Sequence, residues 1–412
     1  GENILINGKD ITAFYILDLL NYSVASESGI DSHIDRLEKM ISILSKNRTK
    51  LQFTIFPFKK IITKEDIRKN LIDTVRIWDN SYQDLPKIIL DNLEDASESF
   101  AILAINIEVT DIGDVESLTI KEVFKSFISN ITTELLMKQN INIDTKRVLD
   151  IERSIYNTIS NNVERASAEL VFYTYVSNIY PSYEISYDNN SFISNNQSEV
   201  MGVVDNNFVG KFGYFEMENE GVDIFGYTPQ KTYASILKVV ELPEEIYSSQ
   251  FPLDVPNIMI HARLMPKKEA EITIKRMRAD IEFEEDTALD AGARDTGHIQ
   301  EDKDLAQKAL NHLAKDGIIT EMEISILVLA TSLEDLRKRR QNIISHLAND
   351  NIFVSFELDQ ANSYINNYVK LRPQSYTHIS DLRYALSFQA DNGTRVGDTG
   401  GKYFSPPIGK GL

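Results

Sequence analysis

Short apolar strand patterns alternate with amphipathic helical patterns in two separate stretches of this chain. In the first stretch, an Asn7-Gly8 turn between two apolar runs predicts a β-hairpin. A helix capped by Asp31 is expected next, followed by a strand that ends at Pro57. A continuous apolar run over 100–109 predicts a strand in the centre of a sheet.

The second stretch repeats this order. It begins with an expected strand over 257–264, which is followed by a helix from Lys267, a second helix and a strand over 321–330. Ser332 is then expected to cap a helix over 333–349. Antiparallel strands with helices between them describe an α+β fold, so the sequence predicts antiparallel sheets with packed helices.

The chain of 412 residues is long enough for two or three lobes, at roughly 150 residues per domain. A segment rich in Asn, Ser and Tyr over 180–207 indicates a boundary. We therefore expect a first α+β lobe over 1–185 and a second over 186–385, which begins with short strands. Residues 386–412 are rich in glycine and proline and are expected to be a linker to a C-terminal domain that this chain lacks.

The chain carries a formal net charge of −19 and contains no cysteine. An acidic protein repels phosphate groups, so we expect no direct contact with nucleic acid. The lack of cysteine excludes disulfides and cysteine-ligated metal sites, and it favours a reducing compartment. Since no apolar run approaches the roughly 20 residues that span a bilayer, the sequence predicts a cytoplasmic protein.

No segment matches a nucleotide-binding or catalytic motif. The nearest to a phosphate-binding loop is 397–402, but its spacer is one residue short and Tyr403 follows it in place of Ser or Thr. The histidines lack the spacing that puts two imidazoles on one helix face, and His261 is expected to be a hydrogen-bonded core or lobe-interface residue. We therefore expect no catalytic residue, cofactor or metal in this chain.

One run of basic residues is unusual in so acidic a sequence. Arg337, Lys338, Arg339 and Arg340 are consecutive on the exposed face of an expected helix. A run of this kind can be an ordinary solvated face. It can also be a patch that docks an acidic partner or phosphate groups, and this is the candidate binding site of the chain.

The C-terminal part of the chain resembles a junction in a known family. Three segments carry the resemblance: Leu371-Arg372-Pro373-Gln374-Ser375-Tyr376, Ser380-Asp381-Leu382-Arg383-Tyr384-Ala385-Leu386 and Val396-Gly397-Asp398-Thr399-Gly400-Gly401-Lys402-Tyr403. They are similar to the segment that precedes the motor domain of the VirB/TrbE/CagE-type ATPases of conjugation and type IV secretion. The Pro-Gly turn of that family stands here as Pro373-Gln374.

The resemblance implies that this chain is an N-terminal docking and assembly domain that lacks the RecA-like motor. ATP and magnesium would then bind the motor domain of the parent protein. The implied partners are membrane-embedded channel subunits, the chain's own motor domain and further copies of itself, at the inner face of a bacterial cell membrane. The residues expected to contact the motor domain are Arg372, Tyr376, Asp381, Arg383, Gly400 and Gly401.

Two other functions stay open on the sequence. A stand-alone enzyme that acts through clustered carboxylates predicts a concave pocket with perturbed pKa values. A stand-alone structural scaffold without catalytic activity predicts a stop codon near Leu412. The docking domain instead predicts a gene that continues into a P-loop domain.

Overall fold

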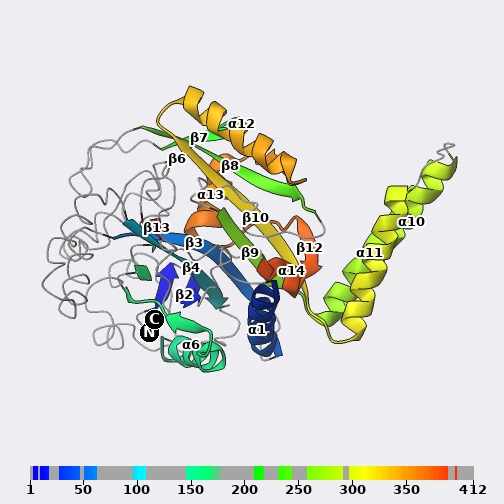
Figure 1. Ribbon diagram of the computed structural model, residues 1–412, viewed down its shortest axis with the longest axis horizontal. Helices are drawn as coiled ribbons and strands as arrows, with labels where there is room; N and C mark the ends of the chain where they lie inside the picture. Colours follow the sequence, from blue (N-terminus) through cyan, green and yellow to red (C-terminus); the bar gives the residue numbers. More distant parts are fainter. Residues whose placement is uncertain are drawn as a thin grey trace, which may run out of the picture.

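The structure, a computed structural model, shows an α+β fold built on one antiparallel sheet (Figure 1). Helices lie on both faces of the sheet, and a pair of long helices projects from one end of it. The residues that the structure describes are 3–7, 10–17, 27–46, 51–62, 96–107, 145–168, 170–171, 174–175, 208–217, 231–243, 258–290, 297–387 and 395–396.

The sheet has 13 described strands, all paired antiparallel. Their order along the main path is β1 (Ile4–Asn7), β2 (Asp10–Leu17), β4 (Ala96–Ile107), β3 (Gln52–Ile62), β9 (Ile258–Leu264), β10 (Ile319–Ala330), β8 (Thr232–Glu241), β7 (Tyr214–Met217) and β6 (Phe208–Lys211). Four short strands pair beside this path: β5 (Val163–Arg165) on β2, β13 (Arg395–Val396) on β4, β11 (Phe353–Phe356) on β8 and β12 (His378–Asp381) on β10.

The pairing of β3 with β9 joins the two halves of the chain. It runs from Gln52 opposite Arg263 to Ile55 opposite Ile260. Strands from both predicted lobes therefore belong to one sheet. The predicted boundary between 185 and 186 lies outside the described residues, as does most of the predicted linker, and the division into lobes stays a prediction.

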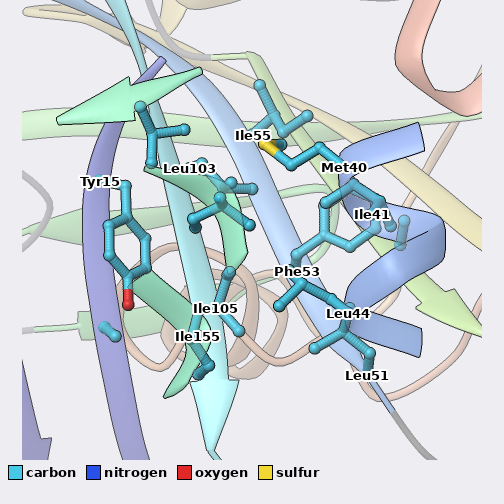
Figure 2. Close-up of a cluster of buried hydrophobic side chains, with 14 of the residues drawn as sticks. Tyr15, Met40, Ile41, Leu44, Leu51, Phe53, Ile55, Leu103, Ile105 and Ile155 are labelled. Atoms are coloured by element: carbon cyan, nitrogen blue, oxygen red, sulfur yellow. The ribbon is translucent and has the colours of Figure 1, made fainter. Parts of the chain in front are cut away.

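One face of the sheet is covered by α1 (Glu27–Lys46), α6 (Thr145–Ile159), α12 (Leu333–Asn349) and α14 (Leu382–Ser387). Helix α1 buries Leu37, Ile41 and Leu44 against the sheet, as its apolar spacing predicts. Figure 2 shows the side chains of α1 facing Phe53 of β3. These contacts form the largest of the buried clusters and hold the first half of the sheet together.

The other face is covered by a C-terminal segment. It consists of α13 (Gln360–Tyr364), the π-helical turn η4 (Ile365–Val369) and the residues that follow it to β12. Tyr364 and Tyr368 are buried there and stack with their ring centroids 5.4 Å apart. Both tyrosines pack in a cluster with strand residues from both halves of the chain, so this segment fastens the sheet from its second face.

Two local predictions were wrong. Helix α1 begins at Glu27, so Asp31 lies inside the helix and does not cap it. No proline stands between Glu27 and Asp31, and Gly29, although a poor helix former, does not stop the helix from extending. Strand β3 continues through Pro57 to Ile62. Strand β9 pairs only with Gln52–Ile55, so one edge of β3 has no described partner at Pro57. Proline has no backbone N–H to donate, and it is tolerated in a strand at such an unpaired edge.

The projecting helices are α10 (Lys267–Asp290) and α11 (Gly297–Ala314). They connect β9 to β10 and form a hairpin that leads away from the sheet (Figure 1). A small cluster anchors its base, with Ala270 and Ile274 against Leu313 and Ile319. With 24 residues at 1.5 Å each, α10 is about 36 Å long, so the tip of the hairpin is far from the sheet.

Candidate functional site

Helix α12 carries the predicted basic patch, and its start is determined locally. The Ser332 hydroxyl accepts a hydrogen bond from the backbone N–H of Asp335 at 3.2 Å, as the predicted cap requires. Leu336 and Leu347 are buried against the sheet. Because these leucines fix the inner face of the helix, the basic run is distributed around its outer face.

The four basic residues have different surroundings. Arg337, Lys338 and Arg339 are exposed, and Arg339 forms an ion pair with Asp335 at 2.8 Å along the helix. Only Arg337 and Arg340 line a depression in the surface. The structure therefore divides the predicted patch into two groove residues and two solvated ones.

Arg340 is held in place by two contacts. Its Nη1 donates a hydrogen bond to the backbone carbonyl of Gly213 at 2.8 Å, and its guanidinium lies 4.5 Å from the ring centroid of Phe356. Burial, and to a smaller extent the neighbouring Arg337, lowers the pKa of Arg340. A guanidinium keeps its charge at neutral pH even so, and Arg340 presents a fixed positive group.

The depression beside α12 has a volume of about 230 Å³, and we call it the α12 groove. Its apolar side chains are unusually exposed: Phe212 is 89% exposed and Leu358 is 79% exposed. Large apolar groups in contact with water next to arginines are typical of a protein-binding surface. The groove is lined by Phe212, Gly213, Tyr214, Leu333, Arg337, Arg340, Phe356, Glu357 and Leu358.

A tight turn brings Phe212 to the groove. Strands β6 and β7 pair with Lys211 opposite Tyr214, which leaves Phe212 and Gly213 as the turn. Gly213 has φ = 75°, a conformation that side chains disfavour. The turn leaves the ring of Phe212 in solvent and directs the carbonyl of Gly213 to Arg340.

Strand β11 forms another side of the groove. It pairs with β8 on one edge, and no described strand pairs with its other edge. Phe353 and Phe356, at its two ends, are both exposed. An edge with unpaired backbone groups and exposed aromatics can accept a partner segment.

The residues predicted to contact a motor domain lie in another part of the structure. Asp381 accepts a hydrogen bond from the backbone N–H of Tyr384 at 2.7 Å and so starts α14. Arg383 forms ion pairs with Asp31, at 2.8 Å, and with Asp35, both on α1. Asp381 and Arg383 thus make separate contacts within the chain, and Arg383 links α14 to α1.

Arg372 and Tyr376 belong to the segment that crosses the sheet after η4. The turn at Leu371 has φ = 53°, and its carbonyl accepts a hydrogen bond from Asn106 Nδ2 at 3.0 Å. Arg372 donates its backbone N–H to the carbonyl of Asn366 at 2.7 Å. Burial raises the pKa of Tyr376. Gly400 and Gly401 lie outside the described residues, so the contact of all six with a motor domain stays a prediction.

A polar cluster that was not predicted from the sequence lies under this segment. Lys238 Nζ lies 3.0 Å from Glu323 Oε2, and Asn367 donates to Glu323 Oε1 at 2.8 Å. Lys238 also donates to Ser375 Oγ at 2.9 Å and lies 3.2 Å from a carboxylate oxygen of Glu357. We call these five residues the buried seam after Lys238, Glu323 and Asn367, which are buried; Glu357 is half-buried and Ser375 is exposed. A charged residue in the middle of an apolar strand, such as Lys238, is the signal that could have indicated it.

His261 lies beside the buried seam, opposite Glu323 in the register of β9 and β10. It is 1% exposed, and its Nδ1 shares a hydrogen bond of 2.9 Å with the hydroxyl of Thr54 on β3. This confirms the prediction of a hydrogen-bonded core residue. Burial first, and the charge of Lys238 second, lower the pKa of His261 to about 3, so the imidazole is neutral at physiological pH.

Charges of opposite sign meet in the buried seam. Burial raises the pKa of Glu323, and Lys238 and Asn367 oppose this increase. Neither the α12 groove nor the second depression, at the base of α10, is lined by Lys238, Glu323 or His261. Asn367 and Ser375 of the C-terminal segment bind Glu323 and Lys238, so these contacts fasten the segment to the sheet.

The part of the chain that the structure describes was also considered for a metal site and for a membrane-spanning helix, and it contains neither. No group of three or more acidic or histidine side chains there is arranged to hold a metal ion. None of the helices in the described ranges combines the length and the apolar composition that crossing a membrane requires. Comparison of the sequence with protein-family models and with curated proteins gives no match.

Proposed function

We propose that this chain is a protein-docking and assembly domain, and that it belongs to an ATPase of conjugation or type IV secretion. The sequence resemblance over 371–403 supports the membership. The α12 groove supports the docking role. In this proposal ATP and magnesium bind the motor domain of the parent protein, and the chain tethers that motor to membrane-embedded channel subunits at the cytoplasmic face.

The main support for the docking role is that exposed aromatic side chains and arginines lie together in the α12 groove. Arginine and aromatic residues are enriched at the centres of interfaces, where few residues supply most of the binding free energy. Phe212 and Leu358 offer apolar area, and Arg337 and Arg340 offer positive charge. The groove therefore suits a segment that carries both an apolar side chain and carboxylates.

We expect the double substitution Phe212→Ser with Arg337→Glu to weaken binding to the membrane partner about 10- to 100-fold, because each removes a central contact. Both side chains are exposed, so the fold should tolerate the changes. The measurement is co-sedimentation of the full-length protein with inner-membrane vesicles that contain the channel subunits. Vesicles of the same lipids without protein separate a protein partner from lipid binding.

Lys338→Glu is the matched control. It makes the same change of charge on the adjacent residue, which does not line the groove. We expect it to change binding less than about threefold, as for a solvated charge. Equal binding by wild type and the Phe212→Ser, Arg337→Glu variant would refute the docking role of the groove.

The motor part of the proposal has its own test. Reading the parent gene beyond Leu412 should show a P-loop domain, and the longer product should hydrolyse ATP while the 412-residue chain does not. A stop codon at Leu412 would remove the ATPase membership but leave the groove to be studied as the binding site of a scaffold.

A further inference from the structure

The tip of the α10–α11 hairpin has a chemistry that the groove lacks. Residues 280–290 hold six acidic side chains and no Lys or Arg. Glu282 pairs with Arg278 and Glu285 with Lys303, whereas Asp280 and Asp286 form no ion pair with any residue that the structure describes. The tip is therefore a concentrated negative charge at the end of a long arm.

This tip also carries an exposed aromatic side chain. Phe283 is 75% exposed, and Asp280 and Asp286 stand three residues before and after it. Residues three apart lie on the same side of a helix, so the phenyl ring is flanked by two carboxylates. An aromatic side chain that is this exposed offers a large apolar contact area to another molecule.

The α12 groove is the chemical complement of this tip. Its apolar side chains, Phe212 and Leu358, match the phenyl ring of Phe283. Its arginines, Arg337 and Arg340, match the carboxylates that flank that ring. The complementarity holds locally even though two copies of a chain with net charge −19 repel each other at long range.

The tip and the groove of one chain lie at opposite ends of β10. The hairpin returns to the sheet where β10 starts, at Ile319, and α12 begins just after β10 ends, at Ala330. A strand of 12 residues at about 3.3 Å per residue spans about 40 Å. Figure 1 shows the hairpin leading away from the sheet at the first of these ends, so the tip is not placed to reach its own groove.

We infer that the α12 groove binds the tip of the α10–α11 hairpin of a second copy of this chain, with Phe283 in the groove and its flanking carboxylates beside Arg337 and Arg340. This goes beyond the proposed function by naming a second partner for the same groove. A contact between two different surfaces of identical chains is head-to-tail. Such contacts build rings when the rotation closes and filaments when it does not.

Sedimentation velocity of the 412-residue chain over a range of concentrations tests this inference. We expect the wild type to form concentration-dependent multimers, which weaken as salt is added. The tip variant Phe283→Ser with Asp286→Lys and the groove variant Phe212→Ser with Arg337→Glu should each lower the association constant at least tenfold. The controls Glu271→Lys, near the base of α10, and Lys338→Glu should associate like the wild type.

Mixing the two variants gives the sharpest result. The tip variant keeps an intact groove and the groove variant keeps an intact tip, so the mixture should form a complex of two chains and no larger one. A mixture that stays monomeric, variants that associate like the wild type, or a wild type that stays monomeric at every concentration would each overturn the inference.

The vesicle experiment keeps this inference apart from the proposed function. A groove variant that loses vesicle binding but associates like the wild type would refute the tip contact and leave membrane docking supported. A groove variant that loses self-association but still binds vesicles would support the tip contact and refute membrane docking through the groove.

Discussion

Replacing Lys238 by alanine is expected to lower the free energy of unfolding by about 3–5 kcal/mol, the usual effect of removing one member of a buried ion pair. The ammonium group of Lys238 is nearly buried and meets the carboxylates of Glu323 and Glu357 and the hydroxyl of Ser375. Without it, the carboxylate of Glu323 stays buried with no opposing charge, and the C-terminal segment loses its fastening to β8. Urea unfolding at pH 7.5 measures this loss.

Two further variants show whether the charge causes the loss. Lys238→Met combined with Glu323→Gln removes both charges and keeps the side-chain volumes, so most of the stability should return. Lys231→Ala removes an exposed ion pair with Glu216 at the start of the same strand and should cost less than about 1 kcal/mol. If Lys238→Ala destabilised no more than Lys231→Ala, the buried seam would not hold the sheet together as described.

The second large effect is a dependence of stability on pH through His261. Its folded pKa of about 3 is below the ordinary value of 6.5. As the pH falls below 6.5, the unfolded chain binds a proton that the folded chain excludes, so stability is present above pH 6.5 and is lost toward pH 3. Each pH unit in this window costs up to about 1.4 kcal/mol, which makes about 3 kcal/mol between pH 6.5 and pH 4.

His261→Gln isolates this contribution, because glutamine can still bond to Thr54 but does not titrate in this window. We expect the variant to be less stable than the wild type at pH 7.5 and to lose less stability on acidification. Glu323, which faces His261, has the opposite dependence: its raised folded pKa adds stability at low pH that fades as the pH rises through that pKa. Parallel stability curves for wild type and His261→Gln would contradict the assignment to His261.

The local features of the fold could be predicted because short-range physics determines them. Ser332 caps α12 through a bond to a residue three positions later, and the apolar spacing of Leu37, Ile41 and Leu44 selects the buried side of α1. The strand at 258–264 was likewise visible as an apolar run. Such signals are contained within one or two turns of chain.

The boundaries failed where a distant element decides them. Asp31 looks like a cap in the sequence, but in the structure its carboxylate binds Arg383, more than 350 positions along the chain. Pro57 looks like a strand end, yet β4 pairs with β3 on both sides of it. In both cases the residue contacts a partner that is remote in sequence, and the boundary that its local sequence predicts is not formed.

By itself the sequence determined the class of fold, the faces of its helices, the start of α12 and the presence of a basic run in an acidic chain. Only the tertiary structure decided that Arg337 and Arg340 belong to a groove while Lys338 and Arg339 do not, because the β6–β7 turn brings Phe212 to α12, and β11 with the residues after it brings Phe356 and Leu358. It likewise joined Lys238, Glu323 and His261 under one segment. Pairing and burial across a sheet depend on contacts between distant residues, and these contacts leave no periodic trace in the sequence.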